Sequence, residues 1–307
     1  MNGALRDRNR LELYPVCRTF LAPLAVSLAL IATPAAAQVA TPDAGGTQKP
    51  AADLDVNRDS ITIGLGAAYL PDYEGSNDYS FSPAPGAIGT VKGHDFVLAG
   101  NRVSFDLIPN RTDNGIELQA GPIAVLNLNR ATTKGIDDPR IRALGKVGTA
   151  VELGGYVGVG KTGIVTSPYD RLSVSLSYRH DVAGASDGGI WQPSINYFTP
   201  LSLKAAVGLF ATAEHADGNY ARSYFGITPA QSVASGLAAY NPRGGWKDWN
   251  VGALGTYALT GNLLHGFKLV GGVTYGRLLN DFGDSPVVSV AGSRTQWLGA
   301  LGVAYTF

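Results

Sequence analysis

From about residue 60 to the end of the chain, apolar side chains alternate with small or polar ones. The final stretch, RTQWLGALGVAYTF, places Leu301, Val303, Tyr305 and Phe307 on one face and mostly small or polar residues on the other. A period of two residues is typical of a β-strand. The pattern predicts an all-β chain with strands at 60–69, 85–91, 94–107, 115–128, 146–160, 170–182, 189–198, 203–214, 219–226, 247–259, 264–277 and 295–307.

A soluble β-sandwich would also alternate, so the length and chemistry of the strands must decide between the two architectures. Many of the predicted strands are as long as the roughly 9–11 residues that a tilted membrane strand needs, whereas the strands of soluble proteins average about 5–6 residues. Aromatic residues recur at the two ends of the apolar face, as in the girdles of outer-membrane barrels. These are Trp249, Tyr257, Phe267, Tyr275, Trp297 and Tyr305. We predict a transmembrane antiparallel up-and-down β-barrel of about 12 strands, with 10 strands as the alternative.

The opposite face carries charges of both signs in mid-strand, which a barrel lumen tolerates and lipid does not. Strand parity predicts that these side chains point inward: Arg102, Asp106, Glu117, Glu152, Arg171, Arg179, Lys204, Glu214, Asp248 and Lys268. Mixed signs favour a salt-bridged interior over an ion-selective funnel. This composition favours a structural or interaction role, with a narrow pore for small solutes as the alternative.

The first 37 residues have the organisation of a secretory signal peptide. A basic segment precedes the apolar run LAPLAVSLALIATP, and small residues up to Ala37 form a cleavage site. The alternative is a buried N-terminal helix. The only cysteine, Cys17, would leave with this segment. We predict a signal peptide at 1–37, a flexible periplasmic leader at 38–58 and an outer-membrane barrel at 59–307. The 24 basic and 24 acidic residues of the chain balance, which argues against binding of nucleic acid.

A barrel with an even number of strands has both termini on the periplasmic side. The predicted strands then place the long loops 70–84, 227–246 and 279–294 outside the cell. The same count places the long loop 129–145 in the periplasm, against the rule that periplasmic turns are short. Either a strand is miscounted, or the loop has a periplasmic role, for which its mixed charges suit specific pairing with a partner. Within the loop 227–246, Thr228, Pro229 and Gly236 predict a short helix over 229–235.

Four stretches together resemble the MipA/OmpV family of outer-membrane proteins (MltA-interacting protein). They are YLPDYEGSNDY at 69–79, YFGITPAQSVASGLAAY at 224–240, RLLNDFGDSPVV at 277–288 and the terminal YTF. The resemblance implies an outer-membrane barrel. For at least one family member it also implies scaffolding between a murein-degrading lytic transglycosylase and a murein-synthesising enzyme. The terminal Phe307 resembles the signal that the outer-membrane insertion machinery reads.

The chain lacks the motifs of a barrel enzyme. Its histidines, His94, His180, His215 and His265, fall at turns or near strand ends, and none has the spacing of a catalytic or metal-binding set. Asp72 and Glu74 form an acidic pair that is by itself poor evidence for a cation site. We therefore expect no enzymatic activity, no cofactor and no metal.

Overall fold

The structure, a computed structural model, describes residues 59–110 and 115–307. Its strands close into one barrel in which each strand pairs antiparallel with its neighbours and β12 pairs with β1. The prediction of an antiparallel barrel of twelve strands is confirmed. The predicted signal peptide and leader lie outside the described residues. The strands are β1 (Ser60–Pro71), β2 (Tyr79–Val91), β3 (His94–Ala99), β4 (Arg102–Phe105), β5 (Ile116–Asn127), β6 (Ala150–Thr162), β7 (Arg171–Asp181), β8 (Gly189–Pro200), β9 (Ala205–Ala216), β10 (Gly245–Ala258), β11 (Gly266–Leu278) and β12 (Thr295–Thr306).

Two of the predicted strands are wrong, and their errors cancel in the strand count. The segment 94–107 is not one strand but the hairpin β3–β4, because Gly100 turns the chain with a positive φ of 58°. The segment 219–226 is the helix α2 (Gly218–Phe225), begun by Asp217, whose carboxylate accepts hydrogen bonds from the N–H groups of Asn219 and Tyr220.

The alternation of the strands separates lipid-facing from lumen-facing side chains. Along β12, Leu301 is 62% exposed, whereas Ala304 and Thr306 are buried. Along β7, serine and arginine side chains are buried while the intervening Val174 and Leu176 are exposed. An apolar exterior around a polar interior is the arrangement that a hydrocarbon environment requires of a barrel.

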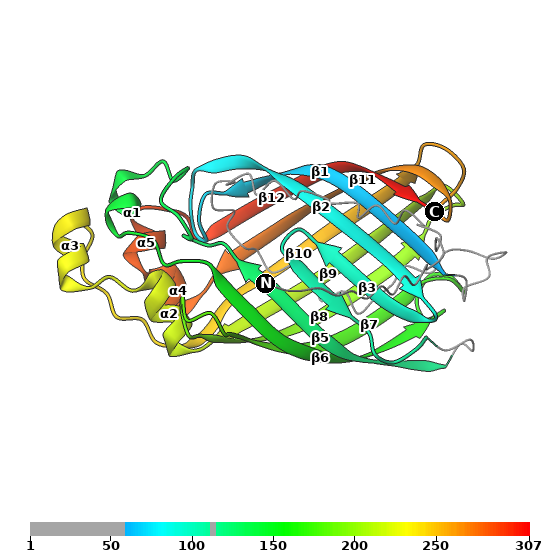
Figure 1. The fold of residues 1–307 in the computed structure, drawn as a ribbon, viewed down its shortest axis with the longest axis horizontal. Helices are drawn as coiled ribbons and strands as arrows, with labels where there is room; N and C mark the ends of the chain where they lie inside the picture. The colour runs from blue at the N-terminus through cyan, green and yellow to red at the C-terminus, as the bar shows by residue number, and fades with distance from the viewer. Residues whose placement is uncertain (1–58, 111–114) are drawn as a thin grey trace, which may run out of the picture. The chain divides into compact units, whose positions relative to one another are not determined.

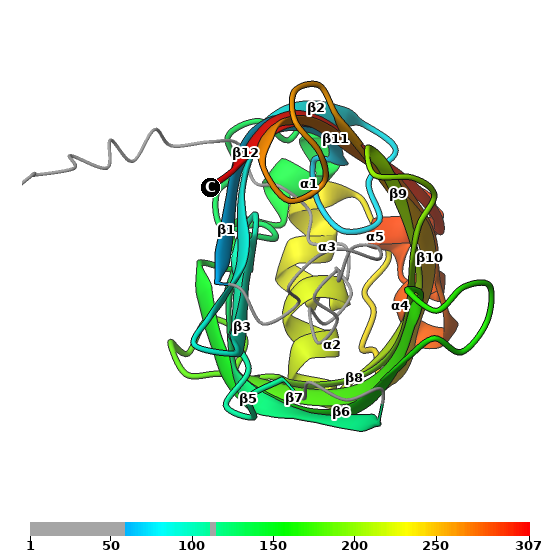
Figure 2. The same ribbon diagram turned by 90° about the vertical axis from the view of Figure 1, so that its right-hand side faces the viewer.

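The helices gather at one end of the barrel, which we call the cap end (Figure 1). They are α1 (Pro139–Ala143), α2, α3 (Pro229–Ser235), α4 (Asn280–Asp284) and α5 (Pro286–Ser289). We call the opposite end, where β12 ends at Thr306, the terminal end. Viewed from the terminal end, the helices lie behind the ring of strands (Figure 2). No helix in the described ranges is long and apolar enough to cross a membrane.

The loop 129–145 lies at the cap end, so its predicted periplasmic position is wrong. It joins β5 to β6 at the same end as the β1–β2, β9–β10 and β11–β12 loops, opposite to Ser60 and Thr306. Counting 94–107 as one strand left four strands before the loop where there are five, which moved the loop to the wrong side; counting 219–226, after the loop, as a strand restored the total of twelve. Outer-membrane barrels have short periplasmic turns and long extracellular loops, which makes the cap end extracellular.

The cap-end loops fold together into a compact layer, which we call the cap: residues 72–78, 128–149, 217–244 and 279–294. Two clusters of buried apolar side chains hold it, one centred on Tyr224, Phe225 and Phe282, the other on Tyr73 and Ile141. The predicted helix 229–235 is confirmed as α3, with Thr228 as its N-cap and Gly236 as its C-cap. The cap therefore has a core of its own above the barrel.

Candidate functional site: the sealed end of the barrel

The β1–β2 loop connects the parts of the cap. The Tyr73 hydroxyl donates a hydrogen bond to the Ala291 carbonyl over 2.7 Å, and the Ser293 N–H donates to the Gly75 carbonyl over 2.7 Å. Tyr73 is 1% exposed, and burial raises the pKa of its phenol. The YLPDYEGSNDY stretch thus ties the β11–β12 loop to the start of the barrel.

Glu74 points from this loop into the barrel and is buried there. Its carboxylate forms an ion pair with the Lys247 ammonium and accepts a hydrogen bond from the Tyr220 hydroxyl over 2.9 Å. Its N–H donates to the Asn129 side-chain oxygen over 3.1 Å. Burial raises the pKa of Glu74, and the charge of Lys247 offsets only part of that effect. The carboxylate of Glu74 is therefore engaged by the protein itself, from β10, α2 and the β5–β6 loop.

Below Glu74, charged side chains of β6, β7, β9 and β10 form a continuous chain of ion pairs. The Lys247 ammonium lies 2.6 Å from Glu214 and 3.1 Å from Asp248, while the Arg179 guanidinium lies 2.6 Å from both Glu214 and Glu152. All of these side chains are buried. We call Glu74, Glu152, Arg179, Glu214, Lys247 and Asp248 the ion-pair belt.

The belt continues across the lumen through Gln192. Its side-chain oxygen accepts hydrogen bonds from Arg179 over 2.7 Å and from Arg102 over 3.1 Å. Arg102 lies on β4 and Gln192 on β8, strands that are not neighbours in the barrel. A hydrogen bond between them therefore joins two separate parts of the wall through the interior.

At the level of the ion-pair belt, the charges of the barrel wall balance one another without the cap. Three basic side chains face three acidic ones, and Glu74 adds a fourth acid from the loop. Since a buried charge is costly unless it is paired, the balance explains how so polar an interior is tolerated. The wall set consists of Arg102, Arg179 and Lys247 with Glu152, Glu214 and Asp248.

Nine of the ten charged residues predicted to face the lumen are buried, and Lys204 is the exception. Lys204 is exposed in the turn between β8 and β9. The prediction assumed a strand from residue 203, but β9 begins at Ala205, so the inward assignment of Lys204 is wrong. Four of the buried residues join the ion-pair belt. Glu117 and Arg171 form a separate pair of 2.6 Å nearer the terminal end, where Asp106 and Lys268 also lie.

Sequence reasoning missed Lys247 and Gln192. Parity along β10 turns Lys247 outward with Trp249, but the β9–β10 register shifts between Trp246 and Asp248. This irregularity lets consecutive residues Lys247 and Asp248 both be buried. Gln192 carries no charge and therefore gave no signal, although it follows the inward parity of β8.

The six aromatic residues predicted to form girdles follow the outward parity of their strands: Trp249, Tyr257, Phe267, Tyr275, Trp297 and Tyr305. Near the cap end, the Tyr275 ring lies 5.5 Å from Trp249 and 4.7 Å from Trp297. Near the terminal end, the rings of Phe267 and Tyr305 lie 4.8 Å apart. The aromatic clusters thus lie near opposite ends of neighbouring strands.

Phe307 follows the last strand at the terminal end. Its N–H donates a hydrogen bond to the Ile61 carbonyl over 3.0 Å, and its side chain is 66% exposed. Its ring lies 4.8 Å from that of Tyr305. The backbone of the final residue is therefore anchored to β1 while the ring stays accessible.

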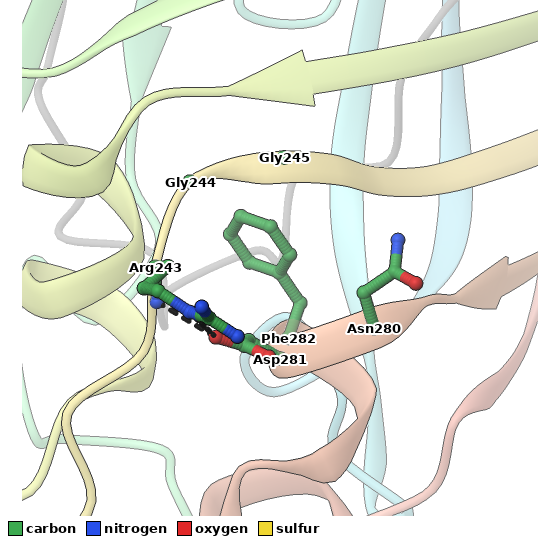
Figure 3. Close-up of a pocket in the computed structure, with 6 residues that line it drawn as sticks. All are labelled: Arg243, Gly244, Gly245, Asn280, Asp281 and Phe282. Carbon is green, nitrogen blue, oxygen red and sulfur yellow. Dashed lines mark hydrogen bonds and ion pairs between the residues drawn. The ribbon is translucent and has the colours of Figure 1, made fainter.

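A surface pocket of about 340 Å³ lies beside the cap, between the start of β10 and α4 (Figure 3). Arg243 reaches toward Asp281, with 3.5 Å between Nε and the carboxylate oxygen. The Arg243 side chain is 89% exposed, so solvent screens this pair.

The sequence matches the family model described as MltA-interacting protein MipA over residues 63–307. The chain belongs to the MipA family. The motifs of this MipA-family protein that carried the resemblance, at 69–79, 224–240 and 277–288, all contribute to the cap. No curated protein matched the sequence significantly.

Solved outer-membrane barrels share the architecture at low sequence identity. The outer membrane channel DcaP of Acinetobacter baumannii is 11% identical, with 81% of this chain and 96% of that chain covered and a TM-score of 0.36. An outer membrane channel from Pseudomonas putida F1 is 11% identical, with coverages of 85% and 98% and a TM-score of 0.43. These likenesses concern the barrel fold alone.

Proposed function

We propose that this protein is an outer-membrane barrel, closed at its extracellular mouth, that serves as a scaffold for murein-synthesising and murein-degrading enzymes. The observation that carries the proposal is the sealed cap end. Glu74 anchors the cap to the ion-pair belt, and the bond between Arg102 and Gln192 crosses the lumen below it. A barrel held closed by buried ion pairs and an apolar cap core suits a structural role better than steady conduction of solutes.

The family description supports the choice of partner, because it names an interaction with MltA, a murein-degrading lytic transglycosylase. Such enzymes act on the periplasmic side of the outer membrane, where the terminal end lies. The contact surface therefore belongs to the terminal-end turns and the leader 38–58, and the loop 129–145 takes no part in it. The chain needs no cofactor and no catalytic residue for this role.

The test measures conductance and partner retention on the same preparation of refolded protein. We expect little or no steady conductance in a planar bilayer, and retention of a lytic transglycosylase and a murein synthase on the immobilised barrel. Deleting residues 38–58 should weaken retention. The matched control, Lys134→Ala with Arg142→Ala on the exposed surface of the cap, should leave it unchanged.

Two results would contradict the proposal. Stepwise conductance without a retained enzyme would favour the alternative, a narrow pore for small solutes. Retention lost in the Lys134→Ala, Arg142→Ala variant and kept after deletion of 38–58 would place the partner at the cap end.

A further inference from the structure

The strands carry almost no charge on the outer face of the barrel. All lysine, arginine, aspartate and glutamate residues within the described strands are buried except two. These two are Lys161, near the terminal end of β6, and Arg277, near the cap end of β11, and both are exposed. A cation on the lipid-facing surface costs most at mid-membrane and little near the interfaces. The only exposed strand charge near the cap end, among the described residues, is therefore an arginine at the extracellular interface.

Arg277 points away from the lumen. Its neighbours in β11, Gly276 and Leu278, are both buried on the inner side, and Leu278 belongs to the apolar core under the cap. Successive side chains of a strand alternate between the two faces of the sheet, so the guanidinium lies on the outside of the barrel.

The arginines of the neighbouring cap already have acidic partners, whereas Arg277 has none. Arg243 faces Asp281 with 3.5 Å between Nε and the carboxylate, and Arg294 forms an ion pair with Asp284. The Leu278 N–H donates to the Arg294 carbonyl, which places that pair at the top of β11. Within the described residues no carboxylate pairs with Arg277. Around α4, three arginines thus face two aspartates, and the unmatched positive charge is that of Arg277.

Aromatic side chains fix the depth of Arg277 in the membrane. Arg277 is level with Trp249 on β10 and Thr295 on β12. Tyr275, two residues closer to mid-membrane on the same face, is level with Trp297. Tryptophan and tyrosine rings collect at the level of the lipid headgroups. Arg277 therefore lies on the cap side of this aromatic cluster, where the phosphates of outer-leaflet lipids lie.

The pocket beside α4 continues this surface toward the cap. The register shift between β9 and β10 buries Lys247 inside the barrel and leaves Trp246 and Trp249 on the outer side. The Asn280 side chain donates a hydrogen bond to the Trp246 carbonyl over 2.9 Å and so holds α4 against β10. Gly245, which precedes Trp246, lines the pocket (Figure 3). The pocket therefore opens on the cap side of the aromatic surface.

The order of these surfaces matches the parts of an anionic lipid. On the membrane side, Val251 and Val273 are 42% and 46% exposed and can contact acyl chains. Arg277 follows, and a guanidinium binds phosphate oxygens in a bidentate manner. The pocket with Arg243 comes last, at the level of a sugar or other polar headgroup. A free phosphate ion would meet only a solvent-screened arginine, whereas a lipid also gains contacts with the apolar face.

We propose that Arg277, with the rings of Trp249 and Tyr275, binds the phosphate of an anionic lipid of the outer leaflet, whose headgroup extends toward the pocket at Arg243. The charge of the site is complementary to this ligand, because the one arginine without a carboxylate partner lies at the level of the phosphates. This inference rests on the outer-membrane barrel and not on the scaffold role.

The test measures the binding of lipid A, a phosphorylated glycolipid of the outer leaflet, to the chain without residues 1–37, refolded in a non-ionic detergent. Native mass spectrometry reports the fraction of protein that carries a lipid at each lipid concentration. The variants are Arg277→Gln, which removes the charge, and Arg277→Lys, which keeps it. The matched control is Lys161→Gln, which removes the other exposed strand charge at the opposite end. Heat-modifiable migration on a denaturing gel confirms that each variant has refolded.

Arg277→Gln should weaken the binding of lipid A about tenfold, the loss expected for a hydrogen bond between charged groups. Arg277→Lys should lose less, and Lys161→Gln should bind as the unaltered protein does. Lipid A without its phosphates should bind the unaltered protein about tenfold more weakly and should not distinguish it from Arg277→Gln.

Three results would overturn the proposal. Equal binding by Arg277→Gln and Lys161→Gln would remove Arg277 from the site. A tenfold loss in Arg277→Gln for lipid A with and without phosphates would show that Arg277 does not recognise the phosphate. Displacement of lipid A by inorganic phosphate at equal concentration would show that the site takes the free ion instead of a lipid.

Discussion

Replacing Lys247 with methionine removes a cation that joins the cap to the barrel wall. Its ammonium contacts Glu74, Glu214 and Asp248, and the residue is 1% exposed. Methionine keeps the length of the side chain and leaves Glu74 and Asp248 as buried carboxylates without this cation. Breaking a buried ion pair by removing one partner costs about 3–5 kcal/mol.

The free energy of unfolding is measured by urea titration of the protein refolded in lipid vesicles. With an m value of about 2 kcal/mol/M, the expected loss lowers the midpoint by about 1.5–2.5 M. Lys161→Met is the matched control, because Lys161 is exposed on β6 and such substitutions usually change stability by less than about 0.5 kcal/mol.

The second variant tests the cause of the loss. Adding Glu74→Gln to Lys247→Met removes one of the carboxylates left without a cation, so part of the lost stability should return. A Lys247→Met midpoint equal to that of Lys161→Met would refute the role of Lys247 in the belt. A double variant less stable than the single one would refute the charge argument.

Three further predictions concern the outer face, the cap and the edge of β2. Leu301→Arg should lower the free energy of unfolding by about 2–4 kcal/mol in the same titration. Ala300 faces the lumen, so Ala300→Arg should lower it less. The reverse order would invert the assignment of the two faces. Burial raises the pKa of Tyr73, so its neutral phenol favours the closed cap. That stability is complete below about pH 10 and is lost as the pH rises above it. The tyrosinate absorbance of Tyr73, taken as the difference between the protein and its Tyr73→Phe variant, should therefore appear at a higher pH in the folded protein than in the unfolded protein. Among the described residues, 79–84 of β2 pair with no strand except β1. Pro83→Val adds an N–H donor to this edge and should yield cross-linkable dimers that the unaltered protein does not form.

The period of two along the chain was sufficient to predict the barrel and the direction of most side chains. The prediction succeeds because successive side chains of a strand point to opposite faces of the sheet. One face meets lipid and the other a polar lumen, so the two faces differ in chemistry. The helix α3 was equally predictable, because Thr228, Pro229 and Gly236 act on their own turn of the chain. Asp217 is a comparable local signal for α2, but the period of two predicted a strand over 219–226.

Only the tertiary structure placed Lys247 in the barrel, moved the loop 129–145 to the cap end and left the cap-end part of β2 without a second partner strand. Each depends on pairing between residues far apart in the sequence: the register shift between β9 and β10, the strand count before the loop, and the point where the β3–β4 hairpin stops. The partner of Glu74 lies on β10, 173 positions along the chain. Sequence patterns report the surroundings of a residue through its neighbours in the chain, whereas the closure of the barrel decides which distant charges must be buried together.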